Sequence, residues 1–210
     1  MVNLSQFFPR LLPYVVGCPE PLAQQALLDA AIEFCNKGNA VSLMLDPITT
    51  IKGTATYEIE TPTQTGVSTV LKLWYDGNVL SPLPYEQALS LFNNPNGAPR
   101  FFYGQYVDEV YSITLLPTPD KTVPNGLQIR VALTPTRSAT QVHTILYDRY
   151  ADAIVQGAIS TLSAIPDQPF TNLPQAAAAA VRFRAEANLA RGEIMHGNVQ
   201  SSLSVKMRAF

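Results

Sequence analysis

Glu58 and Glu60 are the two residues of this chain whose type and spacing come nearest to an acid–base pair. Side chains two positions apart on a strand point to the same side, and two neighbouring carboxyl groups are what a glycosidase uses as acid and nucleophile. The sequence around them has no feature that would bury either carboxyl group. We therefore interpret the pair as the solvated face of a strand.

Asp148 and Asp152 lie one helical turn apart, with Arg149 beside them. Acidic and basic side chains at this spacing form local ion pairs on the surface of a helix. Catalysis would need a nucleophile, a base and an orienting group within mutual reach, and the sequence offers no such set. We interpret these residues as a polar helix stripe and expect a protein that is not an enzyme.

Metal and nucleotide motifs are also missing from the sequence. His143 and His196 are isolated, and no His or Cys pair has the spacing of metal ligands. Residues 93–97, Asn-Asn-Pro-Asn-Gly, have turn chemistry without the Gly-Lys-Ser/Thr ending of a phosphate-binding loop. We expect no cofactor.

Three tyrosines, Tyr103, Tyr106 and Tyr111, follow Arg100 on predicted strands and could imitate a platform on which nucleic-acid bases stack. Aromatic residues on strands more often form core contacts or cross-strand pairs, and the segment has no cluster of Lys and Arg. The sequence therefore gives no support for nucleic-acid readout.

The elements that would position these groups begin with a predicted helix over 19–37, closed by Gly38. Cys18 and Cys35 fall near its two ends, about 25 Å apart at 1.5 Å per residue, so we expect free thiols. The apolar arc of this helix is wider than one core contact requires, which predicts cover from more than one side. Its apolar residues are Leu27, Leu28, Ala30, Ala31, Phe34 and Cys35, and its polar ones Gln25, Asp29, Glu33, Asn36 and Lys37.

Short alternating runs between residues 40 and 136 predict a small antiparallel sheet or sandwich. Asp76-Gly77 is a two-residue hairpin signal, Asp108-Glu109 turns a second pair, and 84–92 predicts one short helix. The predicted strands are Thr54–Glu60, Val67–Tyr75, Phe101–Tyr106, Val110–Leu116 and Leu127–Leu133.

The last zone is predicted to be helical over 141–165 and 173–196, with a short link that makes an antiparallel pair. Arg182, Arg184 and Arg191 form a basic cluster on the second helix. Glu186 and Glu193 interleave with them, which favours a solvated or intersubunit face over a DNA groove.

The 210 residues carry 14 Lys and Arg against 16 Asp and Glu, for a net charge of −2. Only 14% of residues are charged, below the roughly 25% of ordinary soluble domains, and such a surface suits contact with other protein. The near-neutral balance excludes a binder that works by neutralising phosphates over its whole surface. No segment approaches the roughly 20 apolar residues of a membrane span, so we expect a soluble protein made in a cytoplasm.

These elements predict an α+β fold in which the N-terminal helix and the C-terminal helical pair form a bundle. A small antiparallel β subdomain would be inserted into it, and an extended tail would follow. The predicted divisions are 1–39 with 137–196 for the bundle, 40–136 for the β insert and 197–210 for the tail.

The ordered motifs of the chain resemble the head-to-tail adaptor (connector) family of tailed bacteriophages. The resemblance spans about residues 8–193, with Phe170 where Trp is usual and Asn36-Lys37-Gly38 in place of a more basic stretch. The last fourteen residues match no pattern of the family. The segments that carry the resemblance are 8–15 with 17–19, 30–35, 74–77, 99–103, 115–119, 147–158 and 166–170.

This resemblance implies a structural protein of the virion neck, assembled in the host cytoplasm. It implies a homo-oligomeric, dodecameric ring that docks on the portal protein and connects it to nozzle or tail-tube proteins. The genomic DNA would pass through the lumen without specific binding, and no membrane would be involved.

Two surfaces are predicted to make contacts in such a ring. The wide apolar arc of helix 19–37 and small residues of the next helical run predict a subunit interface, and the alternating C-terminal segment predicts a portal-binding tail. The interface residues are Leu27, Ala31, Phe34, Ala151, Gly157 and Ala158, and the tail residues Leu203, Val205, Lys206, Met207, Arg208 and Phe210.

Two other functions stay open at this point. A phage tail must cross a cell wall, and Glu58 with Glu60 would serve a tail-associated cell-wall hydrolase. Trp74 and the tyrosines would instead serve a β module that binds glycans or a receptor.

Overall fold

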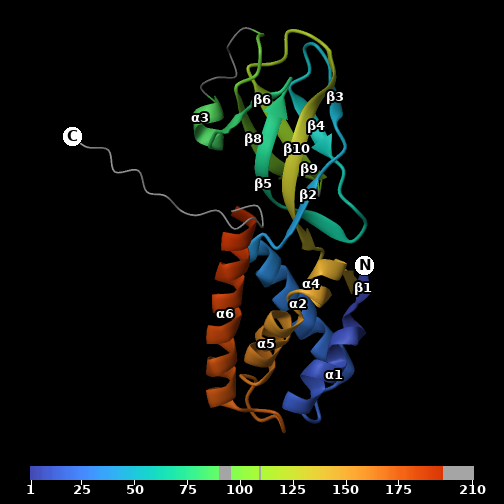
Figure 1. Cartoon of the computed structure of the whole chain (residues 1–210), viewed down its shortest axis with the longest axis vertical. Helices are drawn as coiled ribbons and strands as arrows, with labels where there is room; N and C mark the ends of the chain where they lie inside the picture. Colours follow the sequence, from blue (N-terminus) through green and yellow to red (C-terminus); the bar gives the residue numbers. More distant parts are fainter. Residues whose placement is uncertain (90–95, 109, 196–210) are drawn as a thin grey trace, which may run out of the picture.

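The computed structural model describes residues 1–89, 96–108 and 110–195. Its helices gather at one end of the long axis and its strands at the other (Figure 1).

Short helical turns begin the chain: β1 (Val2–Asn3) leads into η1 (Leu4–Phe7), α1 (Phe8–Leu11) and η2 (Leu12–Tyr14). The Asn3 side chain accepts a hydrogen bond from the Ser5 N–H and so caps η1. Proline in the first turns of α1 and η2 costs no hydrogen bond there. The sequence analysis did not predict these turns.

Helix α2 (Glu20–Gly38) matches the predicted 19–37 closely because both of its end signals are local. Pro19 precedes it in extended conformation, and Glu20 places a negative charge at the positive end of the helix dipole. Asn39 is left-handed, with φ 51°, and its N–H donates to the Cys35 carbonyl.

The predicted helix over 141–165 is broken. Its residues form β11 (Gln141–Val142), α4 (Thr144–Asp148) and α5 (Ala151–Leu162). Helices α4 and α5 are separate because Tyr150, with φ −122° and ψ 16°, leaves the helical region. Helix α6 (Leu173–Met195) follows, and the Asn172 side chain accepts from the Gln175 N–H at its start. Helix α5 packs against both α2 and α6.

A five-stranded sheet has the order β2-β10-β5-β6, and β3 also pairs with β10. Its longest strand, β10 (Val123–Pro135), pairs antiparallel with β5 (Thr65–Tyr75) on one side and with β2 and β3 on the other. The shorter strands are β2 (Val41–Met44), β3 (Ile48–Thr50) and β6 (Asn78–Val79). Asp76 and Gly77, with φ 48° and 78°, make the predicted turn between β5 and β6.

A four-stranded sheet has the order β4-β9-β8-β7. Strands β8 (Phe101–Val107) and β9 (Val110–Leu116) form the second predicted hairpin, and β4 (Thr56–Ile59) pairs with β9. At the other edge β7 (Ser81–Pro82) runs parallel to β8, and α3 (Tyr85–Leu89) follows it. A two-stranded pair of β1 with β11 ties the N-terminus to the chain before α4.

The predicted helical bundle with a small β insert is wrong. Strands run through residues 41–135, and the two larger sheets form a half-barrel. The fold therefore has a large β content and few helices. Two causes explain the error. Strands β2 and β3 are too short to show alternation, and β10 extends well beyond the alternating run 127–133.

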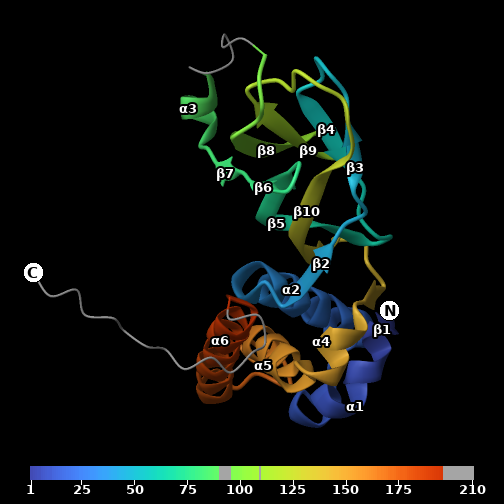
Figure 2. The same ribbon diagram turned by 45° about the horizontal axis from the view of Figure 1, so that its top comes forward.

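One hydrophobic core joins the helices to the sheets. Helix α2 lies across the base of β10, and residues of α2, α5, α6, β5, β9 and β10 belong to the same buried cluster (Figure 2). The predicted division into 1–39 with 137–196, 40–136 and 197–210 stays a prediction.

Candidate functional site

The six residues predicted to form a subunit interface come together inside the single chain. Leu27, Ala31 and Phe34 on α2 and Ala158 on α5 have no exposed surface, and Ala151 is 3% exposed. The Phe34 ring lies 5.0 Å from that of Tyr150 and 5.9 Å from that of Phe183, between centroids. These side chains stabilise the packing of α2, α5 and α6 in the isolated chain, and the subunit contact stays a prediction.

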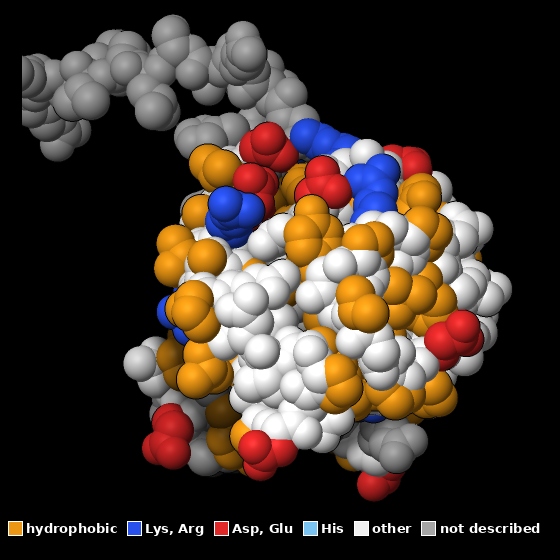
Figure 3. Space-filling view, turned by 90° about the horizontal axis from the view of Figure 1, so that it is seen from below, with side chains coloured by type: hydrophobic (Ala, Val, Ile, Leu, Met, Phe, Trp, Pro, Cys, Tyr) orange, Lys and Arg blue, Asp and Glu red, His pale blue; other side chains and the backbone are white. Residues whose placement is uncertain are grey.

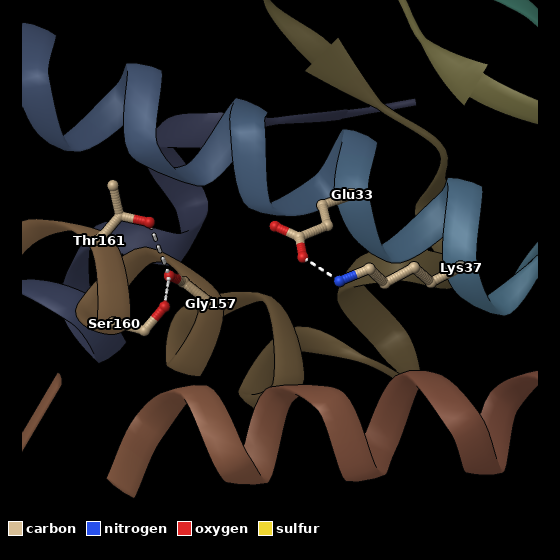
Figure 4. A network of polar contacts seen from close by, with 5 residues as sticks. All are labelled: Glu33, Lys37, Gly157, Ser160 and Thr161. Atoms are coloured by element: carbon tan, nitrogen blue, oxygen red, sulfur yellow. Dashed lines mark hydrogen bonds and ion pairs between the residues drawn. The ribbon is translucent and has the colours of Figure 1, made fainter. Parts of the chain in front are cut away.

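Gly157, the last of the six, marks the closest approach of the three helices. A Cβ at this position would lie 2.8 Å from the Phe183 ring and 2.9 Å from the Ala30 Cβ. Its carbonyl accepts hydrogen bonds from the Ser160 and Thr161 hydroxyl groups, at 2.7 and 3.3 Å (Figure 4). The same view shows the Glu33–Lys37 ion pair on α2.

The six residues of the predicted portal-binding tail lie outside the described residues, as do His196 and Glu109. No structural account of them follows.

Asp148 and Asp152 do not form an acid–base pair. Asp148 ends α4, whereas Asp152 in the first turn of α5 is paired with Arg10 at 2.7 Å. Arg149 instead lies 3.1 Å from Glu193 of α6, and the Tyr150 hydroxyl donates to the same Glu193 oxygen at 3.1 Å. Burial raises the pKa of Tyr150. These contacts link α5 to α6.

The candidate groups for stacking on glycans or bases are largely engaged within the protein. The Lys72 ammonium sits 5.2 Å from the centre of the Trp74 ring, and Tyr103 is 8% exposed. The Tyr106 and Tyr111 rings meet edge to face at 5.0 Å. This arrangement is typical of strand aromatics and offers no open row of rings.

Glu58 on β4 and Glu60 directly after it are exposed, as predicted, because the alternating Tyr57 and Ile59 are buried in the core. They line a groove of about 710 Å³ at the junction of the sheets and α2. We call it the waist groove. Its other walls include Ile32 of α2, Tyr106 of β8 and Val110 of β9, residues that no sequence pattern connects with Glu58.

A second exposed surface lies on α6. Val181 and Leu189 are 66% and 63% exposed, on the side away from the buried Phe183, and Leu173 at the start of the helix is 64% exposed. Arg182, Arg184 and Arg191 are exposed on the same helix. The regular spacing of apolar residues on both sides of this helix was the available sequence signal.

Few charges interrupt the surface at the helical end of the molecule. Figure 3 views this end and shows hydrophobic side chains scattered over an uncharged surface, with the charged groups gathered mainly at the rim. Charged residues do gather in a groove of about 870 Å³ that is lined by α1, η2, α5 and α6, namely Arg10, Arg149, Asp152, Arg182 and Glu186.

The described residues hold neither a cluster of metal ligands nor a helix that could span a membrane. Among residues 1–89, 96–108 and 110–195, no three His, Cys, Asp or Glu side chains are grouped so as to hold a metal ion. The helices in these ranges are too short or too polar to cross a membrane.

The arrangement as a whole has broad low-charge surfaces and extensive helix and sheet edges, which suit contact with protein. No curated protein matches the chain. A family model described as SU10 adaptor protein matches residues 7–208, nearly the whole chain. The chain therefore belongs to the SU10 adaptor protein family and is a bacteriophage adaptor, a structural component of the virion that interacts with other virion proteins.

Proposed function

We propose that this adaptor forms a dodecameric ring at the head–tail junction, docks on the portal protein and connects it to nozzle or tail-tube proteins. The observation that carries the proposal is the family match over residues 7–208. The ring would assemble in the host cytoplasm and stay in the virion neck, and its role would be structural and not enzymatic.

The charge of the chain supports a conduit for DNA. With a net charge of −2, the ring would gain little from counterion release, so the genome could pass through the lumen without being held. Tight phosphate contacts would slow that passage.

The C-terminal segment would contribute to portal binding. Residues 203–208 alternate apolar and polar side chains, with Lys206 and Arg208 on the polar side. An extended segment of this kind gains affinity by adding its backbone to a sheet or groove of a partner. We propose that Leu203, Val205 and Met207 fill apolar pockets there, next to Phe210.

The test is the native mass of the purified chain, alone and mixed with the portal protein of the same virus. We expect a complex with a fixed number of adaptor subunits per portal, seen as a ring beneath the portal by electron microscopy. Absence of binding to the portal would contradict the proposal. Cell-wall lysis by the wild type that is lost in Glu58→Gln would favour the hydrolase instead, and a positive glycan screen would favour the binding module.

A further inference from the structure

Helix α6 presents a continuous outer face that the described residues of the chain leave exposed. Its inner side packs on α2 and α5 through Phe183 and a row of alanines. On the outer side, Val181, Arg184, Asn188 and Arg191 follow each other at intervals of three or four residues, all exposed. We call these four residues the α6 ridge. Such spacing places side chains in one row along a helix.

The arginines of the α6 ridge form no ion pair with the described residues. The same holds for the adjacent Arg182. Glu193 is paired with Arg149, which leaves Glu186 as the acidic group nearby. The ridge is therefore a basic and polar strip with the apolar Val181 at its N-terminal end.

The waist groove has the opposite character. Glu58 and Glu60 on its wall are exposed and enter no ion pair among the described residues. Arg137, the basic residue that lines it, is paired with Asp29 of α2. Tyr106 and Val110 add apolar surface, at 55% and 41% exposure. The groove is therefore acidic with apolar walls.

Helix α6 and the β4–β5 link, which contributes to the waist groove, lie on opposite sides of the molecule (Figures 1 and 2). In Figures 1 and 2, α6 runs along one side up to the base of the sheets, and the teal link between β4 and β5 projects from the other. This link includes Glu60 and leads to Thr65, both of which line the waist groove. Two complementary surfaces on opposite flanks produce a head-to-tail contact, which closes into a ring when the rotation per subunit allows it.

We infer that the α6 ridge of one subunit docks into the waist groove of the next copy of this chain, with Arg184 and Arg191 facing Glu58 and Glu60. Contact between two α6 ridges is disfavoured because it would place arginines against arginines. The inference rests on the proposed ring. It assigns to Glu58 and Glu60 a role in recognising an arginine-bearing helix.

The test is a pair of charge-reversed variants. One carries Arg184→Glu and Arg191→Glu, and the other carries Glu58→Arg and Glu60→Arg. All four positions are exposed, so both variants should fold with wild-type melting curves. Matched controls carry the same kinds of change at other exposed positions: Lys52→Glu with Arg100→Glu, and Glu86→Arg with Asp120→Arg.

Subunit count is measured by native mass spectrometry for the chain alone and with the portal of the same virus. Each reversed variant alone should assemble at least tenfold more weakly than wild type, while the controls assemble normally. An equimolar mixture of the two reversed variants should restore assembly, because each acidic surface again meets a basic one. The restored ring should contain the two chains in alternation.

Three outcomes would overturn the inference. If each reversed variant assembles as well as wild type, the surfaces are not the contact and the proposed ring stands. If both fail and the mixture does not recover, the two surfaces do not meet each other. If wild type forms no oligomer even with the portal, the ring itself is contradicted, a result distinct from the first two.

Discussion

Gly157 on α5 lies directly against the Phe183 ring on α6, so close that a Cβ at position 157 would be 2.8 Å from Cε2 of that ring. On its other side the same Cβ would be 2.9 Å from the Ala30 Cβ of α2. Contacts this short do not occur between real side chains, so a larger residue must push helices apart. One glycine thus sets the spacing of three helices.

Gly157→Ala should destabilise the protein despite the better helix propensity of alanine. The propensity gain is about 1 kcal/mol, whereas overpacking a tight core costs about 1–3 kcal/mol. The Phe183 ring could rotate away, but Ala30 can move only with its backbone. We expect a net loss of up to about 2 kcal/mol in the free energy of unfolding, measured by urea denaturation.

Gly192 on α6 is the matched control for this prediction. A Cβ there would meet nothing within 4 Å, so Gly192→Ala should leave stability unchanged or raise it by up to about 1 kcal/mol. Equal effects of the two substitutions would contradict the close packing at Gly157.

Ala31→Glu should unfold the protein, whatever its effect on assembly. Ala31 has no exposed surface, and burying an unpaired carboxylate costs several kcal/mol, a large part of the stability of an ordinary domain. Gln25→Glu adds the same side chain at an exposed position of the same helix and should melt like wild type. Circular dichroism on both variants makes the comparison. A folded Ala31→Glu protein that fails to assemble would instead support the subunit contact expected from the sequence.

Local signals explain which parts of the fold could be predicted. The start of α2 follows from Pro19 and Glu20, whereas its left-handed cap is Asn39, one residue after the predicted Gly38. The turn at Asp76-Gly77 follows from residues that accept positive φ. The break at Tyr150 could not be predicted, because the apolar spacing continues across it. It follows from tertiary packing, in which Tyr150 contacts Phe34 of α2 and Glu193 of α6.

In the candidate site, too, some features follow from local sequence and others only from tertiary packing. The exposed position of Glu58 and Glu60 follows from strand alternation, which is local. Their neighbourhood does not, because Tyr106 reaches the waist groove only when the two sheets close and its hydroxyl donates to the Val67 carbonyl on β5. A hydrogen bond between residues 39 positions apart has no signature in either segment.

Cys35 should react with thiol reagents only when the protein unfolds. The side chain is fully buried, and burial raises the pKa of its thiol to about 12, so the reactive thiolate is scarce at pH 8. In the Cys18→Ala variant, we expect labelling by a maleimide to be negligible in buffer and rapid in denaturant. Labelling in buffer as fast as that of a free cysteine would contradict the burial. The Cys35→Ala variant reports on Cys18, which is 9% exposed and should label faster than Cys35.

His143 should make the protein less stable in mild acid. Its Nδ1 accepts a hydrogen bond from the Ile145 N–H at the start of α4, which only the neutral ring can do. Burial, and then the positive charge of the N-terminus, lower the pKa of His143 below its ordinary 6.5. His143 therefore binds a proton more weakly in the folded chain than in the unfolded chain. The free energy of unfolding should keep the whole contribution of neutral His143 above about pH 6.5, and it should fall as the pH drops below this value.

His143→Asn isolates this effect, because asparagine keeps an acceptor at the cap position but does not titrate. His196 is present in both proteins and its contribution cancels in the comparison. Urea midpoints at pH 7.5 and 5.5, at constant ionic strength, should show a larger acid-induced loss for wild type than for the variant. The carboxylates titrate mostly below this range and are shared by both chains, so an equal loss in the two proteins would contradict a contribution of His143 to the loss of stability in acid.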